Sequence, residues 1–140
     1  MSRLSRRLLL SAALLSTISS AAFAQKKGAE PSYDGKPLKY WIGELKAAAP
    51  QTRNAAAYAI SGMGAEGKPA VPALVAALTN PTEVNTVRFP ILVALREIGP
   101  EAKEAVEAIT PFVDDRNEEI SAMARKAIKA ITGTDPRPPE

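Results

Sequence analysis

Residues 64–71 read Gly-Ala-Glu-Gly-Lys-Pro-Ala-Val, and they return thirty-five residues later, over 99–106, as Gly-Pro-Glu-Ala-Lys-Glu-Ala-Val. Self-similarity at a period of this length is typical of arrays of helix pairs. One pair cannot bury its apolar face alone, so neighbouring pairs stack and share a core. Function in such an array belongs to the surface that the stack creates. The repeat therefore favours a binding module over an enzyme.

Apolar residues recur at helical spacing along most of the chain. They fall in six segments, which begin with Leu38, Ala56, Val71, Ile91, Val106 and Ile120. Glycine and proline interrupt the series where helices should end. We therefore expect six helices and no strand, paired over residues 37–63, 68–98 and 102–132. Proline lacks an N–H, so we expect a kink or a late helix start at Pro90.

The second helix of each pair carries a common pattern. It reads Arg-Asn-Ala-Ala-Ala-Tyr-Ala-Ile-Ser-Gly-Met-Gly over residues 53–64 and Arg-Phe-Pro-Ile-Leu-Val-Ala-Leu-Arg-Glu-Ile-Gly over 88–99. The third copy, residues 121–132, loses the leading arginine and the closing glycine. Over residues 36–133 the pattern resembles that of HEAT repeats. This resemblance implies an all-α fold, a right-handed α-solenoid of about three antiparallel helix pairs.

The first twenty-four residues resemble a secretory signal peptide. Basic residues precede an apolar run over 8–18, and Ala22 and Ala24 stand where signal peptidase requires small side chains. We expect cleavage between Ala24 and Gln25, a periplasmic or secreted protein, and no stable membrane insertion afterwards. A retained anchor and export by the twin-arginine route stay open as alternatives. Residues 25–35 are predicted to be a flexible linker and 134–140 a disordered tail.

The charge and composition of the chain exclude several function classes. The net charge is +3, and the whole excess comes from Arg3, Arg6 and Arg7 in the predicted signal peptide. The mature chain would then be neutral, which argues against nucleic-acid binding. Cysteine and histidine are both absent, which removes disulfides, the commonest metal ligand and the commonest general base. We expect no enzyme, no catalytic residue, no cofactor and no metal.

A glycine-rich stretch over residues 62–68 partly matches a phosphate-binding loop. Such a loop needs a preceding strand, whereas here a helix precedes it. Pro69 also stands where the loop needs a metal-binding serine or threonine. The match is therefore interpreted as accidental.

Several charged residues are predicted to have structural roles. Arg53 and Arg88, one repeat apart, are expected to bond within the stack, with Asn80 or Asp114 as acceptors. Asp114 and Asp115 are expected to cap the helix that follows them. Arg125 falls where the other copies have apolar residues facing the next repeat, so we expect the array to end there.

One exposed strip of the second helices is the predicted binding surface. In HEAT arrays it lines the inner curve of the superhelix. By helical phase the strip holds Asn54, Tyr58, Ser61, Phe89, Val93, Arg96, Ala122, Lys126 and Lys129. Apolar groups at exposed positions often mark an interface. Alternatively, they pack on the N-terminal segment or on a second copy of the chain.

We therefore expect an exported, noncatalytic protein-protein interaction or scaffold module. Its partner is an unidentified protein, and a second copy of the chain also qualifies. One alternative is a protein related to HEAT-like bilin lyases, against which the missing histidine and cysteine count. The other is a nucleic-acid binder acting through Lys126 and Lys129, against which the neutral mature chain counts.

Overall fold

The computed structural model describes residues 28–137, and a compact unit begins at Pro31. The predicted signal peptide, its cleavage site and residues 138–140 lie outside the described residues. The α-helices are α2 (Leu38–Glu44), α3 (Pro50–Gly62), α4 (Val71–Leu78), α5 (Asn85–Ile98), α6 (Val106–Ile109) and α7 (Glu118–Thr132). Three 3₁₀ segments join or extend them: η1 (Gly64–Ala70), η2 (Gly99–Ala105) and η3 (Thr110–Asp114). The expected all-α class is confirmed at this level.

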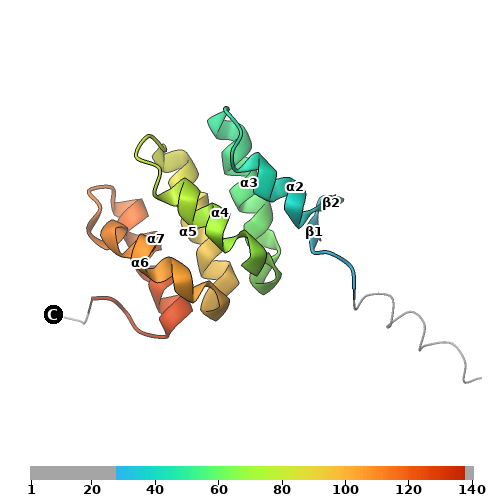
Figure 1. The fold of residues 1–140 in the computed structure, drawn as a ribbon. Coiled ribbons are helices and arrows are strands. Elements are labelled where there is room, and N and C mark those ends of the chain that lie inside the picture. Colours follow the sequence, from blue (N-terminus) through green and yellow to red (C-terminus); the bar gives the residue numbers. More distant parts are fainter. Residues whose placement is uncertain (1–27, 138–140) are drawn as a thin grey trace, which may run out of the picture. The chain divides into compact units, whose positions relative to one another are not determined.

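The helices lie in two layers, as Figure 1 shows. Helix α5 packs between α3 and α7, while α2, α4 and α6 each contact the longer helix that follows them. Ile60, Leu95 and Ile128 occupy equivalent positions in the three long helices, and all are buried. Alanines of the long helices are buried beside them, which lets the helices approach closely. One continuous core therefore runs through all three pairs.

The repeated octapeptide forms the connection between pairs. Gly64 and Gly99 have φ values of 57° and 69°, a region that favours glycine. Each is followed by a 3₁₀ segment whose last residue, Ala70 or Ala105, is fully buried. The α-helical parts of the first helices consequently begin at Val71 and Val106, later than the predicted starts at 68 and 102. The sequence repeat is thus a repeated turn that enters the core.

The third long helix also ends at a glycine, one position later in the repeat pattern than in the first two copies. Gly133 has a φ of 79° and donates its N–H to the Lys129 carbonyl. This is the left-handed cap with which many helices end. Thr132 is the position equivalent to Gly64 and Gly99, and the glycine follows it because α7 ends one residue later in the pattern than α5 and two residues later than α3.

The prediction of no strand is wrong. Strands β1 (Ser32–Tyr33) and β2 (Lys36–Pro37) pair antiparallel across Asp34 and Gly35, which both have positive φ. Asp-Gly is a strong signal for such a two-residue hairpin turn. The Tyr33 ring packs so closely on Gly62 that a Cβ there would approach within 2.6 Å of it. The ordered unit thus reaches into the stretch predicted to be a linker.

Pro90 lies inside α5, and α5 continues through it. Since proline has no N–H, the carbonyl of Thr86, four residues earlier, loses its usual helical partner. The Asn54 side chain of α3 donates to that carbonyl, with 2.6 Å between Asn54 Nδ2 and Thr86 O. Two neighbouring repeats are therefore joined where the proline leaves a carbonyl unpaired.

Replacing Asn54 by Ala should destabilise the fold by about 1 kcal/mol, because the Thr86 carbonyl then loses its donor. In a Pro90→Ala background the new N–H of residue 90 satisfies that carbonyl, so the same replacement should cost clearly less. Urea unfolding of the four proteins of this double-mutant cycle measures the difference. Equal costs in both backgrounds would show that the two residues are not coupled.

Candidate functional site

Three equivalent side chains hold the end of the first helix in each pair. Arg53 Nη1 donates to the carbonyls of Ala47 and Ala48, at 2.7 and 2.9 Å. Arg88 Nη2 donates to the Asn80 carbonyl at 3.1 Å. In the third copy the Ser121 hydroxyl donates to the Val113 carbonyl at 2.6 Å. These contacts support the predicted structural role of the arginines.

Arg53 also forms an ion pair with the next repeat. Its Nε and Nη2 donate to the two carboxylate oxygens of Glu83 at 2.9 and 2.8 Å. Glu83 is only 5% exposed. Burial raises the pKa of Glu83, but hydrogen bonds from Arg53 and the Val84 N–H, and the arginine charges, lower it overall below 4.5. Glu83 was not predicted from the sequence, because its partner lies thirty residues away.

Within residues 28–137, Arg88 forms no ion pair with a carboxylate, although its charge contributes to the lowered pKa of Glu83. Asn80 is its acceptor, as predicted, but the other predicted acceptor, Asp114, pairs with Arg137 instead. The Arg88 guanidinium lies 5.5 Å from the centre of the Phe112 ring, and its buried Nε has no hydrogen-bond partner. The two arginines are therefore alike in the carbonyl they hold and different in their ionic partners.

The predicted capping by the two aspartates is corrected in one respect. Asn117 is the N-cap of α7, and its Oδ1 accepts from the N–H groups of Glu119 and Ile120. Asp115 does not cap α7 itself; its Oδ1 accepts from the N–H of the capping residue Asn117 at 2.8 Å.

Arg125 is half-buried, and its Nε has no hydrogen-bond partner in the described part of the chain.

Glu83→Gln should lower the thermal midpoint and weaken its dependence on acid. A carboxyl whose pKa is lowered by folding stabilises the fold above its unfolded pKa, and this contribution is lost as it protonates. The wild-type midpoint should therefore fall as the pH drops below 4.5, and the Glu83→Gln variant should lack part of that fall. Melting curves followed by circular dichroism across this range measure it.

Glu101→Gln is the matched control. Glu101 pairs with Lys68 at 2.6 Å, and its pKa is also lowered, chiefly by that hydrogen bond. Both side chains are more than half exposed, so their pair should contribute much less to stability. An equal response of the two variants to acid would contradict a special role for Glu83.

The structure brings part of the predicted strip together in one hollow of about 330 Å³, the second-helix hollow. It lies at the N-terminal ends of α5 and α7 and beside the first half of α3. Its lining consists of Asn54, Tyr58, Asn85, Thr86, Phe89, Asn117, Glu119 and Ile120. Tyr58 is 44% exposed, and Phe89 is half-buried against the core.

The other strip residues do not line this hollow. The Ser61 hydroxyl donates to the Tyr58 carbonyl, and Val93 packs on the core. Arg96 pairs with Glu97 at 2.5 Å. Lys126 and Lys129 are exposed on α7 and lie outside the lining of the hollow. Six of the nine strip residues, Ala122 included, thus lie outside the lining of the hollow.

Several members of the hollow were not predicted from the sequence. Asn85 and Asn117 stand at the starts of α5 and α7, and Glu119 follows in the first turn. Each of the three pairs contributes one asparagine to the hollow, although Asn54 stands at a different position of the repeat from Asn85 and Asn117. Asn54 uses one of its two amide hydrogens on the Thr86 carbonyl, and Asn85 and Asn117 also offer amide N–H groups to an incoming main chain.

Metal clusters and membrane spans are two other features that a chain of this length can carry. Within residues 28–137, no group of three or more acidic side chains is placed to hold a metal ion. No helix in that same stretch combines the length and the apolar character needed to cross a bilayer.

Comparison with known proteins identifies one region of the chain. Residues 52–80 match the family described as PBS lyase HEAT-like repeat. They contain α3, η1, α4 and the start of the loop that follows. No curated protein matches the chain significantly. The match agrees with the arginine-led pattern and the repeated turn, so this stretch of the chain is similar to one HEAT-like repeat.

Proposed function

We propose that the chain is a noncatalytic protein-interaction or scaffold module that binds its partner in the second-helix hollow. The observation that supports this is that α3, α5 and the start of α7 all contribute to one hollow. A surface assembled from several repeats is what a repeat array offers to a partner. The proposal includes the arrangement implied by the resemblance, three antiparallel helix pairs wound as a right-handed superhelix.

The chemistry of the hollow suits a protein segment. Tyr58 offers a large exposed ring of a kind enriched among interface anchors. Asn85 and Asn117 offer both donors and acceptors to a main chain. Glu119 is the charged residue in the lining, so the hollow is polar without a strong field. We expect recognition by shape and hydrogen bonding more than by charge.

A photo-crosslinking residue tests this proposal. Benzoylphenylalanine at position 58 should give a discrete covalent adduct in the native organism, because Tyr58 lines the hollow at high exposure. The same residue at the exposed position 103, in η2 and outside the hollow, is the control. Adduct mass on a denaturing gel and mass spectrometry identify the partner. Equal adducts from both positions, or none from position 58, would refute the assigned surface.

Affinity variants complete the test. Tyr58→Ala and Thr86→Arg alter exposed side chains. Phe89 and Val93 are left unchanged because they are partly buried and their replacement would also weaken the core. Tyr58→Ala and Thr86→Arg should each reduce partner binding roughly tenfold or more, as loss of an interface anchor does. Unchanged far-UV circular dichroism shows that the fold is intact.

The proposal places the protein outside the cytoplasm, in the periplasm or secreted. It rests on the basic and apolar segments that precede Ala24. The intact mass of protein recovered from the exported fraction should correspond to a chain that begins at Gln25. An uncleaved chain would instead indicate a retained anchor. Unchanged export from a strain without the twin-arginine translocase would exclude that route.

A second candidate function is lyase activity, because the family that residues 52–80 match is described as a PBS lyase HEAT-like repeat. Under this alternative the protein would attach a bilin to an acceptor protein. Incubation with a bilin and an acceptor, followed by zinc-enhanced fluorescence of a denaturing gel, should yield no adduct if the binding-module proposal is correct. Adduct formation would establish the lyase-related alternative.

A further inference from the structure

A separate groove crosses the other layer of helices, and we call it the first-helix groove. It has a volume of about 500 Å³. Its lining consists of Val75, Thr79, Glu104, Glu107, Ala108, Pro111 and Phe112. These residues come from α4 and its C-cap, η2, α6 and η3. None of them belongs to the second-helix hollow.

The floor of the groove is apolar and only partly covered. Val75, Ala108 and Phe112 are half-buried, and Pro111 is exposed. Phe112 packs against the core and carries the Arg88 guanidinium 5.5 Å from its ring centre, so its position is fixed. Thr79 uses its hydroxyl hydrogen internally, on the Val75 carbonyl at 2.8 Å. A large apolar side chain placed here would meet a preformed surface.

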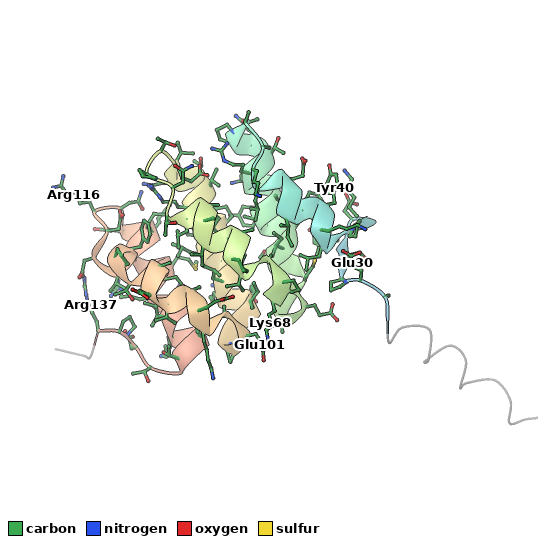
Figure 2. The ribbon with its side chains drawn as sticks, in the orientation of Figure 1. Glu30, Tyr40, Lys68, Glu101, Arg116 and Arg137 are labelled. Carbon is green, nitrogen blue, oxygen red and sulfur yellow. The ribbon has the colours of Figure 1, made fainter. Side chains whose placement is uncertain are left out.

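The rim of the groove is acidic. Glu104 and Glu107 are exposed, and within residues 28–137 neither makes an ion pair. Their neighbour Glu101 differs, because it is paired with Lys68 at 2.6 Å. Figure 2 labels both side chains. Lys68 also interacts electrostatically with Glu104, but no cation of residues 28–137 lies within ion-pair distance of either carboxylate beside the apolar floor. An approaching positive charge would gain from both.

We propose that the first-helix groove is a second docking surface, which takes a protein segment with a large apolar side chain flanked by lysine or arginine. The apolar floor supplies the contact area. The unpaired carboxylates of Glu104 and Glu107 supply the choice of a basic segment, because charge complementarity selects partners and speeds their encounter. This surface is independent of the second-helix hollow, so a scaffold with both can hold two partners.

A random heptapeptide library displayed on phage, selected on the purified full chain, tests the proposal. Enriched peptides should combine an aromatic or aliphatic residue with lysine or arginine. The best peptide, labelled and titrated by fluorescence anisotropy, should bind roughly fivefold more weakly to the Glu104→Gln/Glu107→Gln variant, as the loss of two exposed ion pairs predicts. Added salt should weaken wild-type binding in the same direction.

Two further variants test whether the peptide occupies the first-helix groove. Ala108→Arg places a long cation in the groove and should abolish peptide binding, with an unchanged melting curve as the check on folding. Tyr58→Ala should leave peptide binding unchanged, whatever the fate of the proposed function. No enrichment, enriched peptides without basic residues, or loss of binding in Tyr58→Ala would overturn the proposal. Self-association in sedimentation that the Glu104→Gln/Glu107→Gln variant abolishes would overturn it in favour of a second copy as occupant.

Discussion

Close packing of α5 between α3 and α7 is the constraint on which the rest of the structure depends. Buried alanines, among them Ala57, Ala94 and Ala124, let these helices approach closely. Larger aliphatic side chains then fill the space towards the first helices. This packing limits how the helices can shift past one another. Because apolar contacts have little directional preference, polar contacts between the pairs add a further constraint on their register.

Two polar contacts between the first and second pairs provide this constraint. Asn54 reaches the carbonyl that Pro90 leaves unpaired, and Arg53 reaches the buried carboxylate of Glu83. If the two pairs shifted, the Thr86 carbonyl or the Glu83 carboxylate would lose its hydrogen-bond partner. Leaving such a group without a partner destabilises the fold by more than the hydrogen bond itself stabilises it. Within residues 28–137, the ion pair that joins the second and third repeats, Lys68–Glu101, is exposed instead of buried. Arg88 rests on Phe112 there, and its Nε remains without a partner.

The sequence predicted those features that recur locally. Helical spacing, the glycines that end helices and the carbonyl-holding arginines each depend on residues within one repeat, so a single chain displays them. Glu83 and Thr86 escaped prediction because their partners lie about one repeat away in sequence. The hairpin escaped for another reason. Asp34-Gly35 does signal a turn, but residues 25–35 precede the helical pattern that begins at Leu38 and from the sequence alone are therefore interpreted as a linker.

The two proposed surfaces differ because they lie over different layers of the stack. The second-helix hollow is lined mainly by residues near helix N-termini, where Asn117 caps α7 and the side chains of Asn85 and Thr86 are exposed. The first-helix groove lies between shorter helices, whose 3₁₀ turns bring Ala108 and Phe112 near the surface and Glu104 and Glu107 to its edge. The second-helix hollow therefore offers hydrogen-bonding groups around the exposed Tyr58 ring. The first-helix groove offers an apolar surface with two carboxylates at its edge. Partners chosen by such different chemistry need not compete, and this is the property a scaffold requires.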